Sequence, residues 1–367
     1  MYLALIAFAA FALTNAASAE SRFADQRLEQ AVRTELKQPH GPLRAEDCAH
    51  MLFLTAERAE IQDLSGIESL LDLRLLQLSN NAIADAGPIE PLVALGELHL
   101  SNNPLSSAEP LRSLNRLHTL DLSGTQIRSL APLAALSELR DLSVSSNERL
   151  DVPSLATLAG LRRLTMVNSA LTDLSPLSSL RALERLALGQ NQIADLTPLR
   201  PLTNLRHLNL WQNRISDLSP LAASTELKSL NLSANRIADL SALSSMKSLQ
   251  TLRLTDNRIV RIDALSNLTI LSEVRLGTNR IVDLRPLAGL NQIEILDLND
   301  NAIDDAAPLR GLAHLRVLRL ADNRLRDLAP LLDLPALRLL EIWGNPLSAT
   351  GRAQLDALRA RGVEVQD

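Results

Sequence analysis

Leucine and other apolar residues recur along most of the chain with a period of 22 residues. When residues 227–248 (LKSLNLSANRIADLSALSSMKS) are placed beneath residues 205–226 (LRHLNLWQNRISDLSPLAASTE), seven of the core positions coincide. Steps of 22 from Ala59 to Asn345 visit fourteen positions, and eleven of them are Asn; the exceptions are Ala59, Thr125 and Ser169. Because a single insertion would shift this register, the pattern predicts about fourteen stacked units without a linker.

The LxL segment of each repeat alternates with the two-residue period of a β-strand. Leu208 and Leu210 are therefore expected to point inward, and His207, Asn209 and Trp211 outward. Parallel stacking of these strands predicts one long parallel sheet.

The asparagine that follows each strand is expected to close a turn, because its amide both donates to and accepts from backbone groups that would otherwise be unpaired. Thr125 and Ser169 offer only a hydroxyl at this position, so we expect weaker stacking there. Arg149 stands where most units carry Ile, and Leu150 follows one place late, which predicts a distorted turn edge.

The return path of each repeat carries Ser-Pro or Thr-Pro pairs at Ser175, Thr197 and Ser219. These pairs suit a helix N-cap followed by proline at the first helical position. Short helical turns are therefore predicted on the face opposite the sheet.

The two ends of the repeat array have the pattern of terminal caps. Residues 23–36 (FADQRLEQAVRTEL) place apolar side chains at helical spacing, and residues 345–367 predict an amphipathic helix followed by a short strand. Caps keep the ends of a solenoid soluble. We expect an N-terminal cap over 20–50, repeats over 51–345 and a C-terminal cap over 346–367.

The repeat pattern LxxLxLxxNxIxDLxPLxxL resembles the 22-residue leucine-rich repeat of the internalin family and of the phosphatase-regulating leucine-rich repeat proteins. The resemblance covers residues 22–367, and residues 23–36 resemble the helical N-cap of internalin-like proteins. It implies an α/β leucine-rich repeat solenoid: a curved right-handed superhelix with a parallel β-sheet on the concave face, short helical turns on the convex face and helical caps.

Residues 1–19 have the layout of a secretory signal. An apolar run extends from Leu3 to Leu13, and small residues end at Ala19, where cleavage is expected. The run is well short of the roughly 20 residues that span a bilayer. We therefore predict export to the periplasm or the extracellular space, with an uncleaved, membrane-tethered form as the alternative because no Lys or Arg precedes the run.

Charge and motif content exclude several function classes. The net charge of -5 and the pI near 5.8 argue against nucleic acid as a partner. The sequence contains no HExxH motif, CxxC pair, phosphate-binding loop or dinucleotide fingerprint, so no metal or cofactor is expected. The single cysteine, Cys48, cannot form an intramolecular disulfide and is expected to be a small buried residue of the N-terminal cap.

Trp211 lies in the middle of the repeats and is surrounded by Arg and amide side chains on neighbouring strands, a combination that is typical of interface hot spots. The residues predicted to bind a partner are Arg185, His207, Asn209, Trp211, Asn231, Arg253 and Arg275. Two other interpretations compete: Trp211 packs over its neighbours' side chains, and Glu184 and Glu273 balance the arginine charges. Trp343 is expected to be structural, covering the C-terminal helix.

His99 and Asp121 occupy the same outward row on adjacent strands, with Ser101 and Ser123 beside them, which are the residue types of a hydrolase triad. An open polar face offers no oxyanion hole and no buried acid to activate a serine. Catalysis is therefore not predicted.

These observations predict a monomeric, non-enzymatic scaffold that recognises a protein, or alternatively a glycan, outside the cytoplasm through its concave face. Two alternatives remain: a structural envelope or surface protein, and a phosphatase-regulatory protein if the chain is not exported. The outward rows change from Ser-rich in the first half to Arg, Asn and Trp in the centre, which favours binding over a passive spacer.

Overall fold

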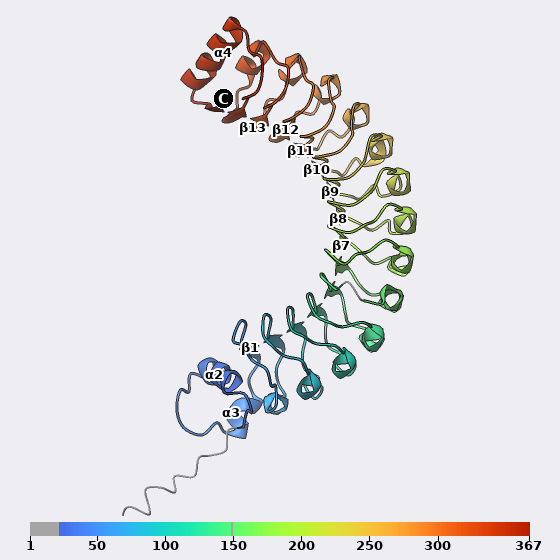
Figure 1. Cartoon of the computed structure of the whole chain (residues 1–367), viewed down its shortest axis with the longest axis vertical. Coiled ribbons are helices and arrows are strands. Elements are labelled where there is room, and N and C mark those ends of the chain that lie inside the picture. The colour runs from blue at the N-terminus through green and yellow to red at the C-terminus, as the bar shows by residue number, and fades with distance from the viewer. Residues whose placement is uncertain (1–21, 148–149) are drawn as a thin grey trace, which may run out of the picture. The chain divides into compact units, whose positions relative to one another are not determined.

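The computed structural model describes residues 22–147 and 150–367 (Figure 1). The chain divides into two compact units: the first ends at Leu158, and the second runs from Ala159 to Asp367. The predicted signal over residues 1–19 and the departure at Arg149 lie outside the described residues.

The first unit begins with two helices, α2 (Gln26–Glu35) and α3 (Ala45–Ala49). Asp25 caps α2 by accepting a hydrogen bond from the backbone N–H of Arg27 at 2.8 Å. Helix α2 packs against the first strand, and its apolar side chains are buried together with Cys48. The helix predicted over residues 23–36 and the burial of Cys48 are confirmed.

Five short parallel strands follow in the first unit, each paired with the next in sequence order. They are β1 (Phe53–Thr55), β2 (Leu75–Gln77), β3 (Glu97–His99), β4 (Thr119–Asp121) and β5 (Asp141–Ser143). The return path of each turn contains a 3-10 helix: η1 (Ile67–Ser69), η2 (Gly87–Ile89), η3 (Glu109–Leu111), η4 (Ala131–Ala135) and η5 (Val152–Thr157).

The second unit continues the same repeat with ten parallel strands in sequence order. They are β6 (Arg163–Thr165), β7 (Arg185–Ala187), β8 (His207–Asn209), β9 (Ser229–Asn231), β10 (Thr251–Arg253), β11 (Glu273–Arg275), β12 (Ile295–Asp297), β13 (Val317–Arg319), β14 (Leu339–Glu341) and β15 (Glu364–Gln366). Its 3-10 helices are η6 (Ser175–Ser179), η7 (Thr197–Leu199), η8 (Ser219–Leu221), η9 (Ser241–Ser245), η10 (Asp263–Leu265), η11 (Arg285–Leu287), η12 (Ala307–Leu309) and η13 (Ala329–Asp333).

Within the second unit the strands line the inner, concave side of an arc, and the 3-10 helices form its outer side (Figure 1). Leu208 and Leu210 are buried, whereas His207, Asn209 and Trp211 are partly exposed on the inner side. The inward and outward positions predicted from the LxL pattern are confirmed here. The core is almost entirely aliphatic.

Each ladder asparagine links its own turn to the preceding one. Asn213 donates to the carbonyls of Leu210 and Leu188, both at 3.0 Å, and its Oδ1 accepts from the N–H of Ile193 at 3.0 Å. Thr125 donates to the Leu122 carbonyl of its own turn at 2.9 Å and has no hydrogen bond to the preceding turn among the described residues. The predicted role of the amide is confirmed; the weaker stacking expected at Thr125 and Ser169 stays a prediction.

The predicted N-caps on the return path are wrong. Ser175, Thr197 and Ser219 are the first residues of their 3-10 helices, not caps, and their prolines occupy the second position. The carboxylate two residues earlier accepts the backbone N–H instead, as Asp195 does from Thr197 at 2.8 Å. A 3-10 turn is tighter than an α-helical turn, and the DLxP sequence supplies this Asp at the position that faces the free N–H.

The residue before each ladder position adopts a left-handed conformation, which the sequence analysis did not predict. Examples are Asn102 (φ 54°), Gly124 (φ 66°) and Thr278 (φ 52°). This conformation is unfavourable for L-residues other than Gly and Asn. The turn that leads from the strand into the ladder requires it in every repeat.

The C-terminal end carries the helix and the strand that the sequence predicts. Helix α4 (Ala349–Ala360) is capped by Ser348, whose hydroxyl accepts from the N–H of Gly351 at 3.0 Å. It packs against η13 and β15, and β15 pairs with β14. Strand β14 is therefore covered at its outer edge.

Candidate partner-binding site

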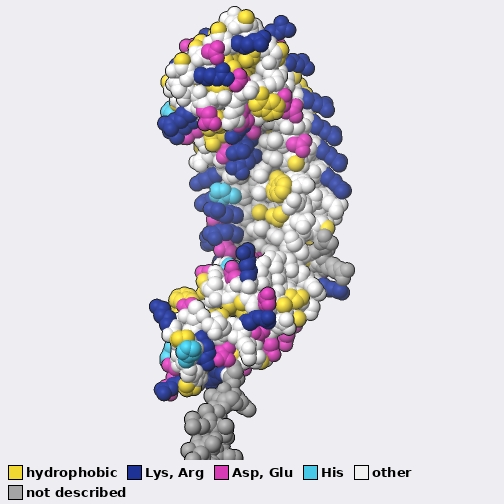
Figure 2. All heavy atoms as spheres, turned by 60° about the vertical axis from the view of Figure 1, so that its left-hand side comes forward, with side chains coloured by type: hydrophobic (Ala, Val, Ile, Leu, Met, Phe, Trp, Pro, Cys, Tyr) yellow, Lys and Arg dark blue, Asp and Glu magenta, His cyan; other side chains and the backbone are white. Residues whose placement is uncertain are grey.

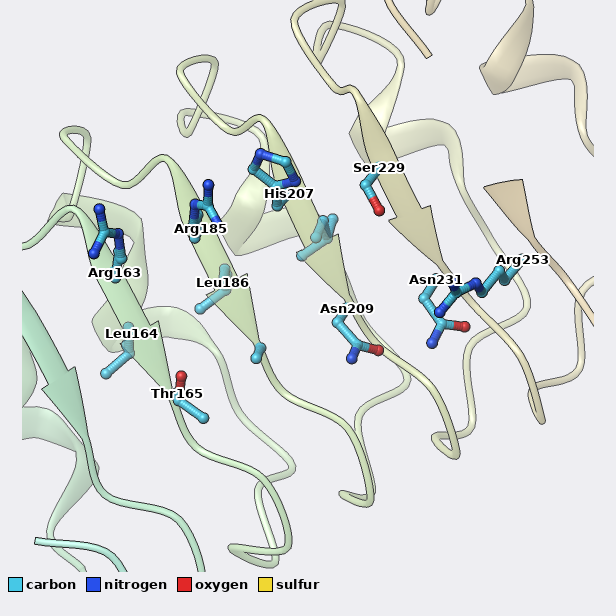
Figure 3. Close-up of a pocket in the computed structure, with 12 residues that line it drawn as sticks. Arg163, Leu164, Thr165, Arg185, Leu186, His207, Asn209, Ser229, Asn231 and Arg253 are labelled. Carbon is cyan, nitrogen blue, oxygen red and sulfur yellow. The ribbon is translucent and has the colours of Figure 1, made fainter. Parts of the chain in front are cut away.

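A shallow hollow of about 280 Å³ opens on the inner side of the second unit, across strands β6 to β10 (Figure 3). The residues that line it belong to two outward rows of the sheet and include the leucines between these rows, whose side chains are buried in the core. They are Arg163, Leu164, Thr165, Arg185, Leu186, Ala187, His207, Leu208, Asn209, Ser229, Asn231 and Arg253.

Strand register explains why these side chains converge. Arg185 pairs with His207 and Ala187 pairs with Asn209, so one row crosses the sheet at the first position of each strand and another at the third. In the row formed by the third residue of each strand, Ala187 stands between the longer side chains of Thr165 and Asn209. Its short side chain leaves the space that forms the hollow.

Positive charge dominates the first row. Arg185 is exposed, and its guanidinium has no hydrogen bond or ion pair among the described residues. Burial, together with the charges of Arg185, Lys228 and Arg206, lowers the pKa of the His207 imidazole. Figure 2 shows basic side chains gathered along the margins of this inner side.

Acidic groups balance part of the charge farther along the sheet. Glu273 accepts from Arg253 Nε at 3.0 Å and from Arg275 Nε at 2.6 Å. Partial burial opposes ionisation of this carboxyl, but the two arginines outweigh it and hold the pKa of Glu273 below its ordinary value. Glu184 pairs with Arg162 at 3.1 Å. The predicted balancing of charge thus applies to Arg253 and Arg275 but not to Arg185.

Trp211 lies over Gly189 of the neighbouring turn. A Cβ atom at Gly189 would come within 2.1 Å of the Trp211 Nε1 atom, so only glycine allows the indole to rest there. The indole is partly exposed on the inner side, two residues after Asn209, which lines the hollow. Trp211 therefore packs over a neighbouring residue and at the same time leaves part of its indole accessible to a partner.

The comparisons with known proteins agree with the repeat geometry. A family model described as leucine-rich repeats (2 copies) matches residues 203–245. The solved structure of an internalin (inlF) from Listeria monocytogenes is 32% identical with a TM-score of 0.81, and the alignment covers 87% of this chain and 95% of that one. The chain belongs to the internalin-like leucine-rich repeat family.

Other matches extend the fold more widely. A leucine-rich repeat protein of Leptospira interrogans is 26% identical with a TM-score of 0.76, and the alignment covers 84% of this chain and 82% of that one. The ectodomain of an Arabidopsis thaliana receptor kinase, solved with Casparian strip integrity factor 2, is 23% identical with a TM-score of 0.70 over 84% of this chain and 40% of that one. No curated protein matches the chain in sequence.

In this internalin-like protein, five of the seven predicted binding residues line the one hollow: Arg185, His207, Asn209, Asn231 and Arg253. Trp211 and Arg275 lie on the same inner side but do not line it. Sequence reasoning missed Arg163, Thr165 and Ser229. The 22-residue register carried a signal for them, because Arg163 and Ser229 occupy the same row as Arg185 and His207.

The residue types of a hydrolase triad do not assemble in the internalin-like fold. Strand register places His99 beside Asp121, but no hydrogen bond joins the two in the described part of the chain. Ser123 bonds to the hydroxyl of Ser143 at 2.8 Å, and Ser101 donates to Ser79 at 2.9 Å. The serines therefore form a small polar network among themselves.

Residues 22–147 and 150–367 contain no group of three or more His, Cys, Asp or Glu side chains arranged to hold a metal ion. None of their helices is long and apolar enough to cross a membrane. Trp343 is about half exposed, at 48% of its surface.

Proposed function

We propose that this internalin-like chain is a non-enzymatic binding protein that acts outside the cytoplasm and recognises a protein partner through the concave face of its second unit. A glycan is the alternative ligand class. The observation that carries the proposal is the convergence of Arg185, His207, Asn209 and Asn231 on one hollow, with the partly exposed Trp211 beside it. Arg and Trp contribute to interfaces out of proportion to their number.

The fold supports this proposal in a general way. A parallel sheet on the inner side of an arc presents a broad surface of outward side chains that do not hold the core together, so they can vary with the ligand. The Arabidopsis ectodomain, which shares the fold, is solved in complex with Casparian strip integrity factor 2. The export that we propose for this chain depends on residues 1–19.

Site-specific photo-crosslinking tests the proposal. A benzophenone amino acid replaces Ser229 at the hollow or, as the control, Ser244 in η9 on the outer side. Both proteins are incubated with envelope fractions and culture medium of the source organism. The Ser229 probe is expected to capture a discrete protein that unlabelled chain competes away, whereas the Ser244 probe does not. The same adducts from both probes, or none from either, would contradict recognition through this face.

A further inference from the structure

The hollow combines hydrogen-bond donors with uncompensated positive charge. The twelve residues that line it include no Asp or Glu. Arg206 and Lys228, which lie close enough to His207 to lower its pKa, are exposed and make no side-chain ion pair among the described residues. Glu184, the residue before Arg185, is engaged by Arg162 at 3.1 Å. The positive potential at β7 to β9 is therefore not cancelled locally.

The two asparagines of the hollow present donors rather than acceptors. Asn209 Oδ1 accepts from the N–H of Trp211 at 3.3 Å, and Asn231 Oδ1 accepts from the N–H of Ser233 at 3.1 Å. These bonds fix the amide orientation and leave both NH₂ groups without a protein acceptor in the described part of the chain. With Arg185 and the hydroxyl of Ser229, they form a set that suits a ligand with acceptors only.

The hollow opens above the short side chain of Ala187. Leu164, Leu186 and Leu208 are at most 2% exposed, because their side chains point into the core on the other face of the sheet. A ligand group that enters the hollow therefore meets mainly the donors of the two outward rows. A glutamate side chain suits this arrangement, since its carboxylate can meet the planar fork of Arg185.

We infer that the hollow receives a glutamate or aspartate carboxylate from an acidic segment of a protein partner, an inference that rests on the proposed function. Arg185 pairs with the carboxylate, and the NH₂ groups of Asn209 and Asn231 donate to it. A sulfated sugar would present a similar oxyanion, so dextran sulfate is the competing probe in the test.

Binding of a carboxylate changes the protonation of His207. The charged groups that act on its imidazole are Arg185 from β7, Arg206 beside it, and Lys228, which precedes β9. All are cationic and favour the neutral imidazole. A bound carboxylate favours the imidazolium, so it raises the pKa of His207. Affinity is then expected to increase as the pH falls from the bound-state pKa to the free-state pKa, about tenfold for each pH unit between them.

The inference is tested with a fluorescent hexaglutamate peptide, and with hexaglutamine as the uncharged probe, at low ionic strength. The parent protein is expected to bind hexaglutamate only. Arg185→Gln is expected to weaken binding by about tenfold or more, since it removes charge-assisted hydrogen bonds. Arg214→Gln is the matched control, because Arg214 is also exposed without an ion pair among the described residues, but lies outside the hollow. It is expected to change binding by about twofold at most.

A second measurement follows the His207 ring by NMR. Hexaglutamate is expected to raise its pKa, and His207→Gln to flatten the pH dependence of affinity while the protein still melts like the parent. Equal binding of hexaglutamate by the Arg185→Gln variant and the parent, or equal binding of both peptides, would overturn the inference. So would dextran sulfate binding through Arg185 when hexaglutamate does not bind. If the Ser229 probe still captures a partner in those cases, the proposed function stands and only the carboxylate inference is lost.

Discussion

Single asparagines hold consecutive turns of the second unit together, as Asn235 shows. Its NH₂ group donates to the carbonyls of Leu232 and Leu210, both at 3.0 Å, while its Oδ1 accepts from the N–H of Ile215 at 3.0 Å. One side chain thus satisfies three backbone groups in two turns. Loss of the amide leaves them without a partner in a largely buried place.

We therefore predict that Asn235→Ala lowers the free energy of unfolding by about 1–3 kcal/mol through unpaired backbone groups. Leu232, which is fully buried, is expected to cost more on truncation: Leu232→Ala should lose about 2–5 kcal/mol through the cavity it leaves. Denaturant melts followed by circular dichroism measure both. Arg236→Ala, an exposed neighbour, is the control that should change little. Unchanged midpoints for both test variants would contradict the ladder description.

The contact between Trp211 and Gly189 gives a second prediction at this scale. In a Trp343→Phe background, where Trp211 is the one remaining tryptophan, Gly189→Ala is expected to shift the fluorescence emission, because the added methyl group lies where the indole rests. Partner binding is expected to weaken as well, with Trp211 itself intact. Gly289→Ala is the control, since nothing lies within 4 Å of a Cβ there. Identical emission from the Gly189→Ala variant and the background protein would show that Trp211 does not rest on Gly189.

At the scale of elements, the N-terminal cap depends on the close contact of Gly66 with the backbone of Arg22 and Phe23. Gly66 has φ 104°, and a Cβ there would meet the Arg22 carbonyl oxygen at 2.3 Å and Phe23 Cα at 2.8 Å. Phe23 is buried under this contact, and so is Cys48 nearby in the cap. Burial raises the pKa of the Cys48 thiol, so it is poorly reactive while the cap is closed.

Gly66→Ala is accordingly predicted to loosen the cap and to speed labelling of Cys48 by a thiol reagent several-fold under native conditions. Gly41→Ala is the control for backbone strain, because Gly41 also has a positive φ (90°), but a Cβ atom there would meet only one atom, at 4.0 Å. Equal labelling rates in both variants would mean that the Gly66 contact does not hold the cap.

Most elements of this fold could be predicted from the sequence because their cause is periodic. The alternation around Leu208 and the Asn ladder specify strand, turn and register in every repeat, and the apolar spacing of residues 23–36 specifies helix α2. The N-cap prediction was wrong because it assigned to Ser175 the role that Asp173 performs: Asp173 Oδ1 accepts a hydrogen bond from the Ser175 N–H at 2.8 Å. Which of two polar neighbours caps a turn depends on how tight the turn is, and the periodicity of the sequence gives no information on that.

The hollow could not be predicted from the sequence, for a different reason. The outward pattern identified Arg185 and His207, but the depth of the surface depends on the short side chain of Ala187 between its longer neighbours. The left-handed conformation before the ladder position is indicated in the sequence by residue types that tolerate positive φ, as at Gly124, Asn80 and Asn102. The sequence analysis did not use these residues to predict that conformation.

At the scale of the whole molecule, the export hypothesis concerns residues 1–19 and is independent of the repeats. We predict that the native protein begins at Glu20, because Ala17 and Ala19 place small residues at the third-last and last positions of the predicted signal. N-terminal sequencing of protein isolated from the source organism measures this. An intact Met1 on protein recovered from the cytoplasm would contradict export.

The central claim is that the inner side of the second unit is a partner-binding surface centred on the hollow. Its most direct test is the dissociation constant of the partner captured by the Ser229 probe, measured for two double variants. Arg185→Gln/Asn231→Ala removes two donors from the hollow, whereas Arg214→Gln/Asn267→Ala makes the same chemical changes at exposed positions outside it. We expect about a hundredfold loss of affinity for the first variant and about a twofold change for the second, with equal melting temperatures. Equal affinities for both variants would contradict this claim.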